Sequence, residues 1–206
     1  MSSDLYNKSV DVEGVANKAL DDSNLLAEVL EGILSKNETT RYNSFKALML
    51  LSEERPEALA ARWEYFARLL SSDNSYHKSS AINIIANLAS ADPEDRFEDI
   101  FDDYFDLLDD ASVIVARYVA RNAGKIAKSK PCLRERIAGR LLDIDRTHHE
   151  QGRKDLIKAD VIQSFEEFFE ESRDREAVLA FVEEQLECGS PKTRKEAKRF
   201  LKTWRT

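Results

Sequence analysis

The sequence predicts an all-α fold, built as a right-handed α-α superhelix, or solenoid, of about five helix pairs. Three observations lead to this fold class. Only 6 Gly and 4 Pro interrupt 206 residues, fewer than an ordinary composition supplies. Apolar residues recur three and four positions apart along nearly the whole chain, without useful strand alternation. Short polar breaks return every 36 to 41 residues, a period typical of stacked helical repeats.

The apolar stripes predict the helices in chain order. Each stripe repeats at helical spacing, as Trp63, Phe66 and Leu70 do, so each helix has one face to bury. Residues 1–20 are expected to be a lead-in or an extra capping helix, and residues 21–206 the repeat domain. The stripes lie within residues 25–34, 45–51, 59–70, 82–89, 97–108, 115–126, 133–144, 150–171, 175–187 and 191–204.

Helix boundaries are predicted where short polar segments supply capping residues. The segments "SKNETT" (35–40), "SSDNS" (71–75), "DDAS" (109–112) and "CGSP" (188–191) are rich in Ser, Asn and Asp, which cap helix N-termini. Pro56, Pro93 and Pro131 each lie near a predicted helix start, where a missing N–H costs least. Ser190 followed by Pro191 predicts an N-cap and a first helical residue.

These boundaries recur in register along the chain. Segments 37–45, 73–81, 110–118 and 189–197 begin 36, 37 and 79 residues apart. The last gap equals two units, and its missing member lies near 149–157. One helix pair cannot bury its apolar stripe alone, whereas stacked pairs build a continuous core.

Three of these units resemble HEAT or armadillo-type repeats. The segments are "LLSSDNSYHKSSAINIIANLA" (69–89), "LLDDASVIVARYVARNAGKIA" (107–127) and "SPKTRKEAKRFL" (190–201). Their common feature is a polar turn, then a basic residue, then a small residue, on the second helix of each pair. Arg41, His77 and Arg194 take the basic position, and Ser44, Ser80 and Ala197 the small one.

The resemblance covers residues 22–206, but two units depart from the pattern. In the third unit, Ile114 replaces the basic residue and Arg117 the small one. The fourth unit is degenerate. The resemblance implies an α-solenoid in which second helices line the concave surface. It says little about function, because such repeats serve many roles.

Charge alternates between the first and second helices of a pair. Residues 92–110 hold ten acids and one base, whereas residues 111–130 hold five bases and no acid. The acids of the helix at 96–109 are expected to face solvent. Arg117, Arg121, Lys125 and Lys128 follow each other by three or four residues and so form one stripe.

A basic ridge on the second helices is therefore the predicted binding surface. Residues 190–206 alone carry seven bases and one acid. Such a ridge would attract an acidic protein segment or phosphates. The predicted ridge comprises Arg41, Lys78, Arg117, Arg121, Lys125, Lys128, Arg153, Lys154, Lys158, Arg194, Lys195 and Lys198.

The leading hypothesis is a non-catalytic scaffold that binds a protein with an acidic or amphipathic segment. One alternative is that acids on neighbouring helices simply neutralise the ridge. Another is nucleic-acid binding, with a relation to alkylated-DNA glycosylases, which also resemble HEAT solenoids. That family places an aspartate and tryptophans in its groove. Trp63 instead lies on a predicted first helix with no aspartate within a turn.

No catalytic, cofactor or metal motif is present in the sequence. Glycines do not cluster into a phosphate loop. His148 and His149 are adjacent, and neighbouring helical residues point apart. The loop beginning at Asp143 has His148 where a calcium loop needs glycine, and Lys154 where it needs an acid. Two cysteines, no apolar span and no signal core predict a cytoplasmic protein without disulfides, expected to be a monomer.

Overall fold

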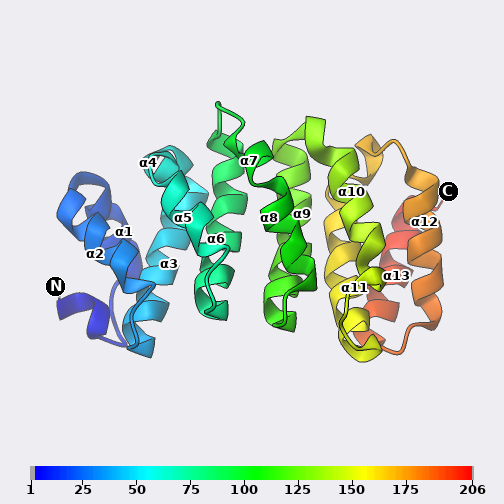
Figure 1. Cartoon of the computed structure of the whole chain (residues 1–206), viewed down its shortest axis with the longest axis horizontal. Coiled ribbons are helices and arrows are strands. Elements are labelled where there is room, and N and C mark those ends of the chain that lie inside the picture. Colours follow the sequence, from blue (N-terminus) through cyan, green and yellow to red (C-terminus); the bar gives the residue numbers. More distant parts are fainter. Residues whose placement is uncertain (1–2, 206) are drawn as a thin grey trace. The chain divides into compact units, whose positions relative to one another are not determined.

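The computed structural model describes residues 3–205, and these residues form helices joined by short loops (Figure 1). No strand occurs among them, so the predicted all-α class is confirmed. The chain divides into two compact units, Met1–Pro93 and Glu94–Thr206. Each unit is described separately below.

In unit 1, α3 is the central helix. It packs against α1, α2, α4 and α6, while α5 packs on α6. Asn43 on α3 also donates to the backbone oxygens of Leu5 and Asn7, at 3.0 and 2.9 Å, and so holds the N-terminal segment. The elements are η1 (Ser3–Tyr6), α1 (Val12–Asp21), α2 (Ser23–Gly32), α3 (Glu38–Glu54), α4 (Pro56–Ala60), α5 (Trp63–Leu69), α6 (Ser75–Leu88) and η2 (Ala89–Ala91), where η denotes a 3₁₀ helix.

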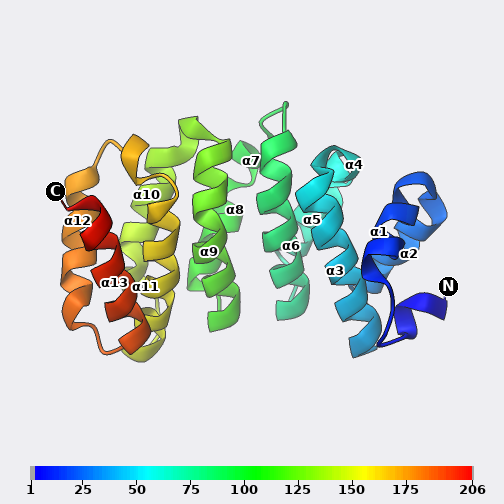
Figure 2. The ribbon, with the colours of Figure 1, turned by 180° about the vertical axis from the view of Figure 1, so that it is seen from behind.

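Unit 2 has two layers of helices. The first layer contains α8, α10 and α12 (Figure 1), and the second contains α9, α11 and α13, which face the viewer in Figure 2. The elements are α7 (Arg96–Asp99), α8 (Phe101–Asp106), η3 (Leu107–Asp109), α9 (Val113–Ser129), η4 (Pro131–Leu133), α10 (Arg134–Leu142), η5 (Asp143–Arg146), α11 (Gln151–Glu166), η6 (Phe169–Glu171), α12 (Arg175–Glu184), η7 (Gln185–Glu187) and α13 (Pro191–Trp204).

Three of the second helices, α3, α6 and α13, begin where a polar side chain caps them. Asn37 accepts a hydrogen bond from the Thr40 backbone N–H at 3.0 Å, and Asn74 accepts one from Tyr76 at 2.9 Å. Ser190 caps α13, and Pro191 is its first residue. These contacts satisfy backbone donors that have no partner within a helix. The polar breaks in the sequence therefore mark real helix starts.

First helices are more broken than the sequence predicts. The stripe at 97–108 spans α7, α8 and η3 instead of one helix, and it starts after Asp95, whose φ of 54° is left-handed. The breaks let the aromatic residues of this stretch all face inward. Phe97, Phe101, Tyr104 and Phe105 are buried and contact one another edge-on or tilted, with ring centroids 4.8 to 6.4 Å apart.

Each unit has its own apolar core. Trp63, Phe66 and Leu48 are buried in unit 1. In unit 2, Phe165 and Phe200 are fully buried, and Phe200 contacts Phe169 edge-to-face with centroids 5.1 Å apart. Burying one such side chain stabilises the fold by about 1.5–3 kcal/mol. The cores hold the second helices in place, and these helices carry the candidate site.

Candidate functional site

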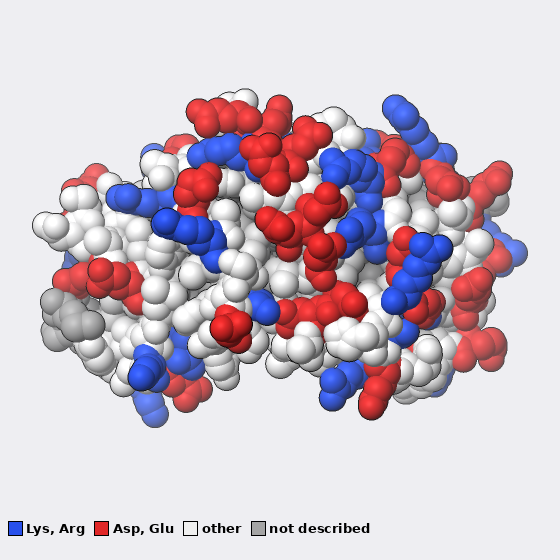
Figure 3. All heavy atoms as spheres, in the orientation of Figure 1, with Lys and Arg blue, Asp and Glu red and all other residues white. Residues whose placement is uncertain are grey.

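In unit 2 the first-layer helices carry the acidic surface. Acidic side chains gather over α7 and α8, with basic side chains beside them (Figure 3). Arg136 of α10 reaches Glu98 at 3.7 Å, and Arg140 of α10 pairs with Asp106. All of these side chains are at least one-third exposed, so each pair contributes little stability. Bases of α10 thus partly balance the acids of this layer.

The second-layer helices bring three cations onto one carboxylate. Asp160, on α11, is fully buried. The Arg117 Nε lies 2.7 Å from its Oδ2, and the Arg121 Nη2 lies 3.3 Å from its Oδ1. The Lys192 Nζ, from α13, lies 3.1 Å from Oδ1. We call Arg117, Arg121, Lys192 and Asp160 the Asp160 cluster.

Close packing between α9 and α11 positions this cluster. The Gly124 backbone N–H donates to Ser164 Oγ at 3.1 Å, and Ser164 Oγ donates to the Ala120 carbonyl at 2.5 Å. A Cβ at Gly124 would lie 2.7 Å from the Ser164 carbonyl oxygen, so only glycine permits this approach. On the other side, Thr193 of α13 donates from Oγ1 to the Asp155 carbonyl. The three helices are therefore fixed around Asp160.

The cluster retains positive charge at the surface. Three cations meet one carboxylate, which leaves a net charge of +2. A buried carboxylate is stable only when it is paired and hydrogen-bonded, and here the cations serve that purpose. The side chains of Arg117, Arg121 and Lys192 remain 29%, 48% and 40% exposed. Their outer faces can therefore meet a ligand.

Other predicted bases surround the cluster. Lys195 and Lys198 are exposed on α13, and Arg153 is exposed on α11. Lys125 and Lys128, farther along α9, act on the carboxyl of Glu167, the residue that follows α11. Burial raises the pKa of Glu167, and the two lysines partly oppose that increase. At this end of the ridge, two lysines therefore act on one carboxyl group. In the Asp160 cluster, three cations share one carboxylate.

Arg41 and Arg194 bind the turns of their own hairpins. Arg194 Nη1 donates to the Cys188 carbonyl at 2.5 Å, and Arg41 Nη1 donates to the Ser35 carbonyl at 3.0 Å. The guanidinium of Arg41 also stacks 4.3 Å from the Tyr76 ring centroid. Both belong to the predicted ridge, but one guanidinium nitrogen of each holds a turn of the fold.

Lys154 and Lys158, two further residues of the predicted ridge, both contact Asp145. Lys158 is buried, and its Nζ lies 2.8 Å from the Asp145 carboxylate. Lys154 donates to the Asp145 carbonyl, also at 2.8 Å. Both side chains hold the η5 turn because they reach back along α11. Lys78 lies in unit 1, on α6, as Arg41 does on α3, whereas the Asp160 cluster belongs to unit 2.

Sequence reasoning missed the residue that organises the site. Asp160 was not singled out, and Lys192 was noted only as part of a basic tail. A signal was present, because Asp160 stands within the apolar run "IKADVI" (157–162). A carboxylate between buried neighbours must find cations. The spacing of Asp160 from Arg117, 43 residues, is close to one repeat.

The exposed aromatic row that nucleic-acid binding would favour is not found on this surface. Trp204 packs on Phe169, with ring centroids 5.2 Å apart. Tyr118 is half-buried, with Arg121 5.6 Å from its ring centroid. Trp63, the tryptophan that the glycosylase comparison involved, is 1% exposed. The Trp63 ring is therefore closed to a base, and the other two rings are partly covered.

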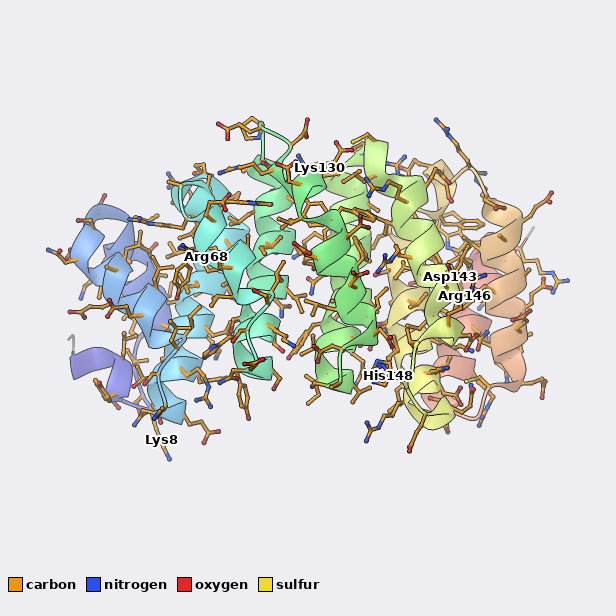
Figure 4. The ribbon with its side chains drawn as sticks, in the orientation of Figure 1. Lys8, Arg68, Lys130, Asp143, Arg146 and His148 are labelled. Carbon is orange, nitrogen blue, oxygen red and sulfur yellow. The ribbon has the colours of Figure 1, made fainter. Side chains whose placement is uncertain are left out.

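The histidine pair contributes to a loop contact. His148 lies on the connection between α10 and α11, near Asp143 and Arg146 (Figure 4). Its backbone N–H and its Nδ1 both lie 2.6 Å from Asp109 Oδ1. Within residues 3–205, His, Cys, Asp and Glu side chains form no group of three or more that could hold a metal ion. Nor does any described helix have the length and apolar character of a membrane span.

Comparisons with known proteins assign no family to the chain. No family model and no curated protein matches the chain. A crystal structure of an engineered protein is 17% identical in sequence. The two structures superpose over 98% of this chain and 92% of that chain, with a TM-score of 0.49. The candidate site therefore stands on its own geometry.

Proposed function

We propose that this protein is a non-catalytic binding scaffold of the HEAT type, a right-handed solenoid of about five helix pairs. The second-layer face of unit 2 recognises an acidic segment of a partner protein. The Asp160 cluster carries this proposal, because a buried carboxylate holds three cations together and leaves their outer faces exposed. Repeat architecture supplies such faces readily.

Contacts within each unit support the repeat architecture. The Asn87 side chain donates to Ser52, 35 residues away in unit 1. In unit 2, Gly124 and Ser164 are bonded across 40 residues. These separations are close to the 36-to-41-residue period of the sequence. Equivalent helices of successive repeats are neighbours in a solenoid, so such bonds are expected there.

Turn contacts give further support to the HEAT resemblance. Arg41 and Arg194 each donate to a carbonyl six residues earlier. His77 Nδ1, in the same position of its unit, lies 3.1 Å from Ser72 Oγ, five residues earlier. In three units the residue at the basic position therefore contacts the turn that precedes its helix. The small residues at Ser44 and Ala197 are fully buried, as close helix packing requires.

An acidic protein segment fits this face better than nucleic acid does. Residues 94–206 hold 22 bases and 25 acids, which gives unit 2 a net charge of −3. The positive potential is therefore local, whereas the long, uniformly charged backbone of DNA or RNA would meet repulsion beyond the cluster. A short carboxylate-rich segment needs only a local positive surface.

The proposal is tested by direct binding with an Arg121→Glu/Lys192→Glu variant. Arg117 is kept so that Asp160 remains paired. A fluorescein-labelled peptide of about twelve residues, rich in Glu and Asp, is titrated by anisotropy at low salt. We expect binding to weaken at least about tenfold, equivalent to about 1.4 kcal/mol, because two attractive contacts become repulsive.

An Arg62→Glu/Arg68→Glu variant is the matched control, because these exposed arginines lie in unit 1. This variant changes the net charge of the protein by the same amount, but the changed residues lie outside the Asp160 cluster. Circular dichroism checks the fold of both variants. Equal weakening in the two variants, or none in either, contradicts the proposed site. A single-stranded oligonucleotide that binds more tightly than the peptide would favour the nucleic-acid alternative.

A further inference from the structure

Two exposed apolar side chains lie one helical turn from the Asp160 cluster. Ile114 is 58% exposed and precedes Arg117 by three residues on α9. Leu156 is 38% exposed and precedes Asp160 by four residues on α11. Residues three or four apart share one side of a helix. Both side chains therefore lie on the cationic side of their helices, toward the helix N-termini.

The position of Ile114 is unusual within its repeat. It corresponds to Arg41 and Arg194, which reach back and bind the preceding turn. An isoleucine cannot make that hydrogen bond, and here it is largely exposed. It is also a less favourable helix residue than the straight-chain side chains that suit exposed sites. The fold therefore gives no reason for an exposed isoleucine at this position.

Packing between α9 and α11 places these residues on one surface. Arg117 and Asp160 are in contact across the two helices, and farther along the same pair Ser164 bonds to Ala120 and Gly124. Both helices therefore run in the same direction at a nearly constant offset. Ile114 lies one turn before Arg117, and Leu156 lies one turn before Asp160. Both apolar residues therefore lie toward the same end of the α9–α11 pair.

We propose that the partner segment is amphipathic: a large apolar side chain contacts Ile114 and Leu156, and flanking carboxylates contact Arg121 and Lys192. This inference rests on the proposed function and specifies its ligand. Charge complementarity selects the acidic residues. The apolar contact sets the position of the segment, because protein interfaces combine a small apolar centre with a polar rim.

Arg117 lies between the two parts of this surface. It is held by Asp160 at 2.7 Å and is less exposed than Arg121. Its aliphatic stem can join the apolar part while its guanidinium faces the carboxylate, as long basic side chains commonly do. A segment with an acid next to a leucine, isoleucine or phenylalanine would match this order of side chains.

The test compares three labelled peptides of about twelve residues. One contains four Glu and a central Leu, the second has Ser in place of Leu, and the third has Lys in place of Glu. We expect the Glu–Leu peptide to bind about tenfold more tightly than the Glu–Ser peptide, the effect of burying part of a leucine side chain. The Lys–Leu peptide should bind far more weakly than either.

An Ile114→Ser/Leu156→Ser variant should lose the preference for Leu yet keep its affinity for the Glu–Ser peptide. Tyr42→Ser is the matched control, because Tyr42 is equally exposed, at 57%, but lies on α3 of unit 1. That variant should retain the tenfold preference. Thermal unfolding verifies that both variants remain folded, as exposed substitutions should allow.

Each outcome separates this inference from the proposed function. If both Glu peptides bind wild-type protein equally, the apolar contact is overturned while the acidic-segment function stands. If the Leu preference persists in the Ile114→Ser/Leu156→Ser variant, these residues do not form the contact. If none of the three peptides binds, both proposals fail. Tight binding of the Lys–Leu peptide removes the electrostatic part of both.

Discussion

At the scale of single residues, the position of a basic residue along its helix does not determine where its charged group lies. Arg41, Arg194 and Lys158 were all assigned to a binding ridge, yet each reaches back to its own hairpin or turn. A long side chain one turn into a helix can point to solvent or to the preceding loop. The choice depends on which backbone carbonyls and carboxylates lie nearby in the folded chain. The residue type and its position in the sequence do not give this information.

Asp160→Asn tests the residue that holds the cluster together. The amide keeps the size of the side chain but removes the charge that three cations contact. Charge-assisted hydrogen bonds contribute about 1.5–3 kcal/mol each, and water can replace part of them for half-exposed cations. We therefore expect the free energy of unfolding in urea to fall by about 1–3 kcal/mol.

Asp99→Asn provides the comparison for this measurement, because Asp99 is exposed on α7. Its effect should remain within about 0.5 kcal/mol. If the two variants unfolded at the same urea concentration, the Asp160 carboxylate would have no organising role. The Arg117–Asp160 distance would then be a consequence of packing by other residues.

The lowered pKa of Asp109 predicts that the stability of the protein depends on pH. Partial burial acts to raise the pKa of this carboxyl, but hydrogen bonds from the His148 backbone and ring, with the charges of both histidines, outweigh it and lower the pKa below 3.8. A carboxyl with a lowered folded-state pKa binds protons more readily when unfolded. Its stabilisation is therefore present above about pH 4 and is lost as the pH falls further.

Asp109→Asn should remove this contribution from the acid side of the stability curve. The measurement is the free energy of urea unfolding between about pH 6 and pH 3. Wild type and variant should differ most at the upper end and converge toward the lower end. A constant difference across this range would show that the carboxyl does not titrate differently in the folded protein.

At the scale of helices, the sequence predicted the boundaries of the second helices better than those of the first helices. The polar breaks located the starts of α3, α6 and α13 correctly, since capping side chains leave a local signal. The stripe at 97–108 did not reveal the breaks between α7, α8 and η3. Periodicity records which side chains are buried, and a chain with short breaks can bury the same aromatics.

Gly124→Ala tests the close approach of α9 and α11. Alanine is normally the better helix residue, but its Cβ would lie 2.7 Å from the Ser164 carbonyl oxygen and 3.0 Å from the Glu167 side chain. The helices must separate, which costs about 1–3 kcal/mol when a core is overpacked. We expect a lower melting temperature and weaker binding of the acidic peptide, because the Asp160 cluster spans the same two helices.

Gly139→Ala on α10 is the matched control, because no neighbouring atom lies within 4 Å of the added Cβ. It should stabilise the protein by about 0.5–1 kcal/mol through helix propensity alone. Thermal unfolding of the two variants in parallel measures both effects. Stabilisation by both substitutions would mean that α9 and α11 are not held at this distance by Gly124.

At the scale of the whole molecule, the total charge conceals the site. The chain carries a net charge of −8, and the cationic cluster occupies only a few side chains of unit 2. The alternation of acidic and basic segments predicted that two faces of the helix pairs differ. It did not predict which bases would be neutralised, because Asp160 lies 43 residues from Arg117 and 32 from Lys192. Only the packing of α11 against α9 and α13 brings these positions together.

Because each helix contacts mainly its neighbours, a substitution in the core should destabilise the surrounding helices more than distant ones. Phe200 is fully buried and its ring contacts Phe169 edge-to-face and Trp204 at a tilt, near the C-terminal end. Phe200→Ala should cost about 3–5 kcal/mol at its own position. In a chain stabilised by neighbouring repeats, opening begins where the interface is weakest. Hydrogen exchange should therefore accelerate in η6, α12 and α13 while amides of α1, α2 and α3 keep their rates.

Leu48→Ala supplies the reciprocal experiment in unit 1. Leu48 is fully buried on α3, so exchange should accelerate around α1, α2 and α3 and leave α13 unchanged. Opposite patterns in the two variants would support stacked repeats with separate local stabilities. Equal acceleration across the chain in either variant would instead indicate one cooperative core. That result would contradict the solenoid on which the shared second-helix face depends, while leaving the Asp160 cluster itself to be tested by peptide binding.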